Sequence, residues 1–148
     1  IPFAMPRFSQ RSLDRLRTCH ADLQTLMHEL IQYFDVTIVQ GHRSVEEQAE
    51  LYASGRTKEG PILTHIDGVT KLSKHNHQPS QAVDIVPYPI NWADTDRMYL
   101  MGGYVKALAI KLKEAGQISH DIRWGGDWDG DTEVQDQSFM DLPHFELR

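Results

Sequence analysis

The order of hydrophobic patterns along the chain predicts an α+β domain, in which about three helices pack around a small antiparallel sheet. Three stretches carry apolar residues at helical spacing. Short segments rich in β-branched or aromatic residues lie between and after them. No internal repeat, low-complexity tract or linker divides the 148 residues, so we expect a single domain over 1–148.

Three helices are expected, over residues 9–31, 44–55 and 94–116. The first carries apolar residues at intervals of three or four, as a helix with one buried face does. The second opens with a capping box, because Ser44 is followed three residues later by Glu47. A glycine close to the end of each of the last two helices is expected to terminate it.

Four short strands are expected, over residues 36–39, 82–86, 122–124 and 144–147. The first two consist mainly of β-branched residues, and prolines follow the second directly. The stretch 56–74 contains a Gly-Pro pair and shows no sustained period, so it is expected to form a loop over the site described below.

Composition excludes several functional classes. The chain has 15 Lys and Arg against 21 Asp and Glu, a net charge of −6, and phosphate binding needs a basic face, so we expect no nucleic-acid partner. No apolar run approaches the roughly 18 residues of a membrane span, so no membrane insertion is expected. No signal peptide is visible in the first residues. Cys19 is the only cysteine, so any metal would rest mainly on His and Asp.

Two segments about 60 residues apart contain the parts of a catalytic zinc site, one with His75 and Asp84 and the other with Asp141 and His144. Two imidazoles and one carboxylate can hold zinc and leave a position for water, which a further carboxylate can deprotonate. Asp84 and His144 fall on predicted strands, which would put this site at the sheet. Eight histidines also produce some His/Asp clusters by chance, so spacing alone leaves both interpretations open.

The same segments resemble the motifs of a known zinc peptidase family. Three motifs are similar to those of the VanY/D-Ala-D-Ala carboxypeptidase family: Ser-x-His ending at His75, Ala-x-Asp ending at Asp84 and Asp-x-x-His ending at His144. That family includes the L-alanyl-D-glutamate endopeptidases of bacteriophage endolysins. Resembling stretches cover nearly the whole chain and lie at 8–13, 41–44, 82–87, 124–128 and 141–146.

This resemblance implies a Zn²⁺ cofactor and assigns roles to five residues. His75, Asp84 and His144 would be the zinc ligands, and Asp141 would be the catalytic base. Arg43 would bind a substrate carboxylate or stabilise the developing oxyanion, since its charge is permanent and its planar fork matches a carboxylate. A structural salt bridge is the alternative role for Arg43.

The chain departs from the family pattern at one point. The family's histidine and aspartate lie seven residues apart, whereas His75 and Asp84 lie nine apart. His77 has the usual spacing, but it has His75 rather than serine two places before it. We expect a local expansion over 76–81 with His75 as ligand, and His77 as the alternate ligand or a neighbouring group.

By the resemblance, the substrate is the stem peptide of bacterial peptidoglycan. The compact size and the stretch 8–13 look most like a single-domain endolysin that cleaves the L-Ala–D-Glu bond, with D-Ala-D-Ala carboxypeptidase as the alternative. A third possibility is a non-catalytic zinc domain that binds the cell wall, in which His77 would complete a closed site. A monomeric endolysin would lie in the host cytoplasm before lysis and act on the cell wall after release.

The stretch between the last two strands offers two more predictions. Trp124 and Trp128 flank a Gly-Gly-Asp turn and are expected to pack under the site, where one of them would be able to touch substrate. The acidic residues over 127–133 resemble a sparse calcium loop without the glutamate spacing of an EF-hand. A solvated acidic loop is favoured there, and calcium binding is the alternative.

Overall fold

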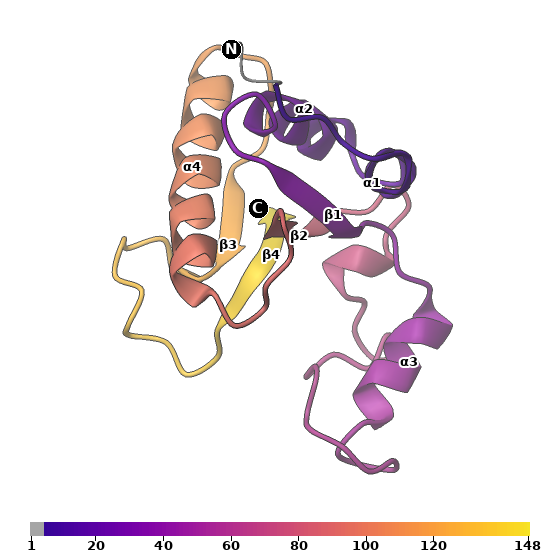
Figure 1. Cartoon of the computed structure of the whole chain (residues 1–148). Helices are drawn as coiled ribbons and strands as arrows, with labels where there is room; N and C mark the ends of the chain where they lie inside the picture. The colour runs from indigo at the N-terminus through magenta and orange to yellow at the C-terminus, as the bar shows by residue number, and fades with distance from the viewer. Residues whose placement is uncertain (1–4) are drawn as a thin grey trace.

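The computed structural model describes residues 5–148 and has the α+β architecture predicted from the sequence (Figure 1). Its helices are α1 (Gln10–Leu16), α2 (Ala21–Leu30), α3 (Val45–Ala53) and α4 (Thr95–Glu114), with a 3₁₀ helix, η1 (Lys74–Asn76). Its strands are β1 (Val36–Gln40), β2 (Ala82–Pro87), β3 (Ile122–Gly125) and β4 (Asp141–Leu147). Within residues 5–148, no helix has the length and apolar character needed to cross a bilayer.

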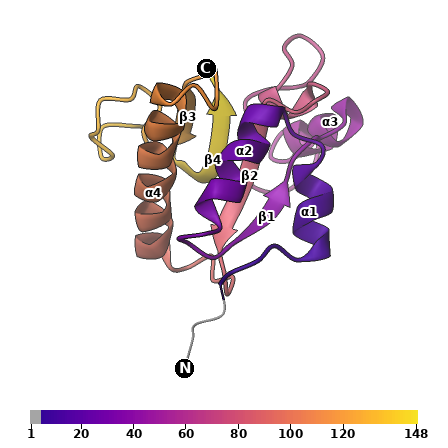
Figure 2. The ribbon, with the colours of Figure 1, turned by 90° about the horizontal axis from the view of Figure 1, so that it is seen from above.

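The four strands form one sheet in the order β1-β2-β4-β3, and every neighbouring pair is antiparallel. β4, the last strand in the chain, therefore lies between β2 and β3. Helices α1, α2 and α4 cover one face of the sheet, while α3 and the loop after it lie beyond the end of β1 (Figures 1 and 2). Leu23 and Leu26 of α2 and Met101 of α4 are fully buried in one core with Ile85 and Phe145 of the sheet.

The prediction of one helix over the first part of the chain is wrong, because α1 and α2 are separate. Between them, Cys19 forms an isolated bridge with Ser80: the Ser80 amide donates to Thr18 O, and the His20 amide donates to Ser80 O, each at 2.8 Å. His20 then caps α2, as its Nδ1 accepts from the amide of Asp22. This long-range contact draws the chain out of the helix, so four α-helices form instead of about three.

Trp124 of β3 is packed between two glycines. A Cβ atom on Gly102 of α4 would lie 2.2 Å from the indole ring, and one on Gly126 would lie 2.3 Å from it. The ring is 5% exposed and stacks on Phe145, and its Nε1 donates to Leu142 O at 2.8 Å. Trp124 therefore packs beneath β4 as predicted, and it ties the beginning of that strand to α4.

The Gly102 contact gives a matched pair of variants on α4. Gly102→Ala is expected to lower the free energy of unfolding by about 1–3 kcal/mol, because the new methyl group overpacks against Trp124. On the adjacent exposed Gly103, a Cβ would meet no described atom within 4 Å, so Gly103→Ala should be neutral or stabilising by up to about 1 kcal/mol. Urea denaturation measures both, and equal effects would contradict the packing described.

Asp22 ties α2 to the segment before β3. Its Oδ2 accepts from the Ser119 amide at 3.0 Å, the Ser119 hydroxyl at 3.1 Å, the His120 amide at 3.1 Å and His120 Nδ1 at 2.7 Å. Burial opposes ionisation of Asp22, but the hydrogen bonds from His120 and Ser119 outweigh it and lower its pKa from 3.8 to about 2.

The lowered pKa of Asp22 predicts a pH-dependent contribution to stability. A carboxyl whose pKa is lower in the folded state stabilises fully above the unfolded pKa, and loses that effect as pH falls through the folded pKa. Asp22→Asn should therefore cost about 2 kcal/mol above pH 4, and the gap from the unmodified protein should close between about pH 4 and pH 2. Urea denaturation over this pH range measures the gap, and a gap that stays constant would contradict the role of Asp22.

Candidate metal centre and active site

His75 is held in place by a capped 3₁₀ turn. The Ser73 hydroxyl accepts from the His75 amide, and Asn76 Oδ1 accepts from the Ser73 amide, which makes a capping box around η1. The His75 side chain is 2% exposed, and its Nδ1 lies 2.7 Å from the carbonyl oxygen of Gly41. A carbonyl only accepts hydrogen bonds, so Nδ1 carries a proton, and Nε2 is the nitrogen left to bind a metal.

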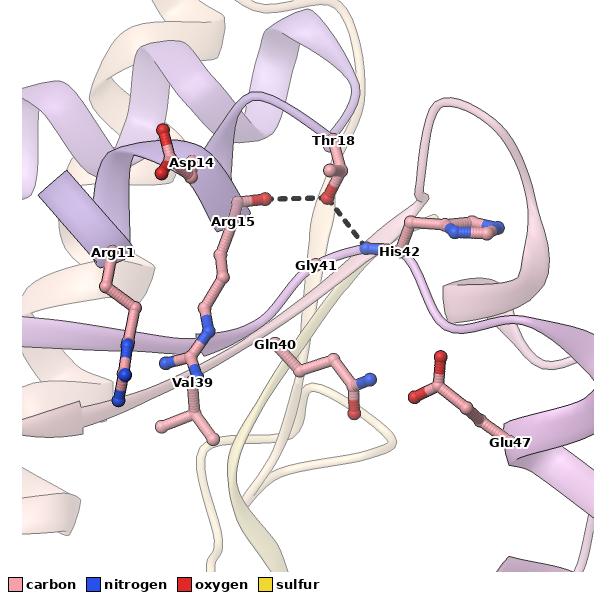
Figure 3. Close-up of a pocket in the computed structure, with 9 residues that line it drawn as sticks. All are labelled: Arg11, Asp14, Arg15, Thr18, Val39, Gln40, Gly41, His42 and Glu47. Carbon is pink, nitrogen blue, oxygen red and sulfur yellow. Dashed lines mark hydrogen bonds between the residues drawn. The ribbon is translucent and has the colours of Figure 1, made fainter. Parts of the chain in front are cut away.

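The turn that presents the Gly41 carbonyl is fixed to α1. Thr18 Oγ1 donates to Arg15 O at 2.6 Å and accepts from the His42 amide at 2.8 Å, as Figure 3 shows. A Cβ on Gly41 would lie 2.3 Å from Thr18 Oγ1, so only glycine permits this approach. The residues in Figure 3 line a cavity of about 580 Å³ that includes Asp14 and Glu47 as well as basic side chains.

The sheet brings Asp84 and His144 together, because they are register partners on β2 and β4. Asp84 Oδ1 lies 3.1 Å from His144 Nδ1 and 3.2 Å from His75 Nε2. In this group of His75, Asp84 and His144, the three candidate ligand atoms all lie within 4.8 Å of one another. His77, which follows η1 and is half-buried, is not a member of this group in the described part of the chain.

The other nitrogen of His144 is also held. Nε2 lies 2.8 Å from Glu146 Oε1, and Glu146 Oε2 accepts from Arg123 Nη2 at 2.9 Å. Burial opposes ionisation of Glu146, but hydrogen bonds from His144 and Arg123 outweigh it and keep its pKa below the usual value. Sequence reasoning assigned no role to Glu146. The signal for it was its position two residues after His144, which places both side chains on one face of β4.

The charges of the group support one another. Burial raises the pKa of Asp84, but hydrogen bonds from His144 and His75 outweigh it and hold that pKa far below the usual range. Burial lowers the pKa of His144, but its hydrogen bonds to Asp84 and Glu146 raise it to about 9. A divalent cation on the same three atoms would replace the imidazole protons shared with Asp84, since metal ligands must be deprotonated. Two imidazoles and a carboxylate suit Zn²⁺ and related divalent ions.

Asp141 faces the same cavity, of about 470 Å³, as the His75, Asp84 and His144 group. It begins β4 opposite Gly125, where a Cβ would lie 2.1 Å from Asp141 O, so this close pairing needs glycine. Burial raises the pKa of Asp141, and the negative charge of Asp84 adds to this effect against the opposing cations nearby. A carboxyl with a raised pKa is suited to take up a proton near neutral pH.

Arg43 lines this cavity and also makes structural contacts. Its Nε and Nη2 donate to Gln40 Oε1 at 3.0 and 2.7 Å, and its Nη1 donates to Gln48 Oε1 at 2.9 Å. Its Nη2 lies 3.7 Å from Asp84 Oδ2. The structure therefore contains the salt bridge considered for Arg43 and also the position beside the cavity that a substrate role requires. Gln48, which the resemblance includes after the turn at 41–44 but to which it assigns no role, is fully buried and orients the guanidinium.

Trp128 lies at the cavity wall rather than underneath the site. Its ring is 5.6 Å from that of His144, and its Nε1 donates to Phe139 O at 2.8 Å. The acidic residues beyond it gather as the sequence pattern suggested: carboxylate oxygens of Asp127, Asp129 and Asp131 lie within 4.8 Å of one another. Asp129 and Asp131 are exposed, as a solvated loop requires, but Asp127 is buried.

Comparisons with known proteins indicate the family of this chain. A family model described as phage L-alanyl-D-glutamate peptidase matches residues 4–148. The chain is 32% identical over 113 residues to the peptidoglycan L-alanyl-D-glutamate endopeptidase CwlK of Bacillus subtilis (strain 168), which covers 76% of this chain but only 60% of that protein. It is 26% identical over 137 residues to the L-alanyl-D-glutamate peptidase of Escherichia phage T5, with 88% of each protein covered.

A solved structure supports the fold. The crystal structure of the Serratia marcescens L-Ala D-Glu endopeptidase ChiX superposes with a TM-score of 0.65 at 24% identity, covering 97% of this chain and 91% of that one. At this identity, the likeness speaks for the fold alone. The family model spans nearly the whole sequence and confirms the resemblance seen in the motifs: the chain belongs to the phage L-alanyl-D-glutamate peptidase family.

Proposed function

We propose that this chain is a zinc-dependent peptidoglycan peptidase that hydrolyses the L-Ala–D-Glu bond of cell-wall stem peptides. The observation that carries the proposal is the grouping of His75, Asp84 and His144 at one cavity with the half-buried carboxyl of Asp141. Two histidines and one carboxylate are a ligand set found in catalytic zinc sites, which would keep a position for water. The relatives named for this activity support the choice of bond.

The cavity also fits an acidic peptide. Arg43, Lys71, Lys74 and Arg123 line it together with the acidic side chains of the site, Asp84, Asp141 and Glu146, although the chain as a whole has a net charge of −6. A stem peptide that contains D-Glu carries free carboxylates, which these cations would attract and orient. We further propose that residues 1–148 form a single catalytic domain that acts as a monomer, lies in the host cytoplasm before lysis, and reaches the cell wall afterwards.

In this mechanism, His75, Asp84 and His144 would hold Zn²⁺, which when bound would polarise the scissile carbonyl and lower the pKa of water. Asp141 takes the proton from the attacking water and returns it to the leaving amine. Arg43 stabilises the negative charge that develops on the carbonyl oxygen, from a guanidinium held in place by Gln48.

The choice of His75 over His77 can be tested by metal content. After dialysis in zinc buffer, His75→Ala should lose most of its bound zinc, because Nε2 of His75 faces Asp84 and His144. His77→Ala should keep its zinc. Elemental analysis of both variants measures this. Zinc loss in His77→Ala with retention in His75→Ala would reverse the assignment.

The reaction can be tested on purified peptidoglycan. The protein should release fragments that begin at D-Glu and leave L-Ala on the glycan, and a chelator should stop their release. Asp141→Asn should keep its zinc but lose about 100-fold or more in turnover, because the base is gone. Asp96→Asn, at an exposed site on α4, is the control and should behave normally.

Mass spectrometry of the digest separates this proposal from its alternatives. Release of free D-Ala alone would assign the chain to D-Ala-D-Ala carboxypeptidases instead. Binding of cell walls without any cleavage, by folded and zinc-loaded protein, would support a non-catalytic domain. Near-normal turnover of Asp141→Asn would refute the role of Asp141 as the base.

A further inference from the structure

Glu146 stands out because it is a buried carboxylate to which the proposed mechanism gives no part. It is 6% exposed and lies in β4 with Ala82 of β2 as register partner on one side and Arg123 of β3 on the other. His144 lies two residues before it in the same strand, so the two side chains share one face of the sheet. Ala82 has a small side chain, and Glu146, His144 and Arg123 share that face with Asp84 of β2.

Both oxygens of Glu146 have a specific partner. Oε1 lies 2.8 Å from His144 Nε2, and Oε2 accepts from Arg123 Nη2 at 2.9 Å. The Arg123 guanidinium also lies over the ring of Trp128, 5.4 Å from its centre, and that ring is 5.6 Å from the ring of His144. Each of these four side chains therefore contacts two of the others, which leaves the His144 ring little freedom to rotate.

The contact with Glu146 determines which nitrogen of His144 is free. An ionised carboxylate only accepts, so Nε2 keeps its proton, and Nδ1 is the nitrogen whose lone pair a metal would use after the second proton is lost. Nδ1 is the atom that lies 3.1 Å from Asp84. His75 is arranged the opposite way, with Nδ1 bonded to the Gly41 carbonyl and Nε2 turned toward Asp84. The two histidines thus offer different nitrogens to one point, each fixed by an acceptor behind it.

A contribution to folding stability does not explain why the Glu146 and Arg123 ion pair is buried. Replacing a buried pair by apolar residues of similar size is often neutral or stabilising, whereas removing one partner is strongly destabilising. Acceptors behind metal-bound histidines commonly set ring orientation and basicity. We propose that Glu146, held by Arg123, is a positioning residue that fixes the Nε2–H tautomer and the orientation of His144, and so sets the affinity of the metal site. This inference rests on the proposed role of His144 as a ligand.

The test compares zinc affinity in two variants. One removes the charge of Glu146 and leaves Arg123 without its counter-charge, and the other removes both charges together. Glu146→Gln keeps the shape and a weaker acceptor, and should lower zinc affinity about tenfold. The double variant Arg123→Leu/Glu146→Leu removes acceptor and counter-charge together, and should lower it by up to about 100-fold. Competition with a chromophoric chelator measures affinity, and circular dichroism checks that each variant is folded.

The chain offers a matched control in a second carboxylate–histidine pair. Asp22 Oδ2 lies 2.7 Å from His120 Nδ1 on the loop before β3, in a separate His20, Asp22 and His120 group that could itself hold an ion, so the control compares affinity at the His144 site alone. Asp22→Asn should lose stability but keep the zinc affinity of the unmodified protein. A further readout is the imidazole ¹⁵N spectrum of zinc-loaded protein. His144 Nε2–H should be protected from exchange in the unmodified protein and should exchange faster in the double variant.

The outcomes separate this inference from the proposed function. Wild-type zinc affinity in Glu146→Gln and in the folded double variant would overturn the positioning role, while the proposed function would stand. If the double variant does not fold, Glu146→Gln alone decides. If the unmodified protein and Asp22→Asn both fail to bind zinc, the proposed metal function and the role of Glu146 fail together.

Discussion

The antiparallel register between β2 and β4 is the constraint on which the site depends. It sets Asp84 opposite His144 and Ala82 opposite Glu146, so two candidate ligands and the acceptor behind one of them meet on a single face. Because side chains alternate along a strand, a slip of one residue would turn His144 and Glu146 to the opposite face. The core enforces the register, since Val83 and Phe145, which are partners on the other face, are fully buried.

Close contacts between backbone segments also position residues of the site. Gly41 lets the β1 turn reach His75 with a carbonyl oxygen, and Gly125 lets β3 lie against the first residue of β4. At each position a Cβ would come within 2.3 Å of a neighbouring atom, so the backbone would have to move. His75 and Asp141 are therefore oriented by main-chain contacts from other elements, which vary less than contacts between flexible side chains. A hydrolytic site needs this rigidity, because small displacements of a base or ligand reduce turnover sharply.

Local patterns predicted the elements whose partners lie nearby in the chain. The predicted cap at Ser44 and the apolar stripe of α4 correspond to observed helices, and the four strands lie close to their expected positions. The break between α1 and α2 was missed because its cause is the contact of Cys19 with Ser80, about 60 residues away. The same contact helps to explain the unusual spacing of nine residues between His75 and Asp84. The residues between His75 and Asp84 include Ser80, which pairs with the first helical segment, so the longer spacing serves a packing contact without moving His75 from the site.

The candidate site was predictable as a set of residues, but the way they are held was not. The resemblance to the family's motifs named His75, Asp84, His144, Asp141 and Arg43, whereas the spacing of the histidines and aspartates alone left the zinc interpretation open. Register and tautomer depend on which strands become neighbours, and no local pattern states that β4 inserts between β2 and β3. The resulting face buries acidic and basic groups side by side, an arrangement that generally contributes little to stability compared with apolar packing. Its persistence in so small a core is best explained by chemistry that needs charges held in fixed positions, in keeping with the common trade of stability for function at active sites.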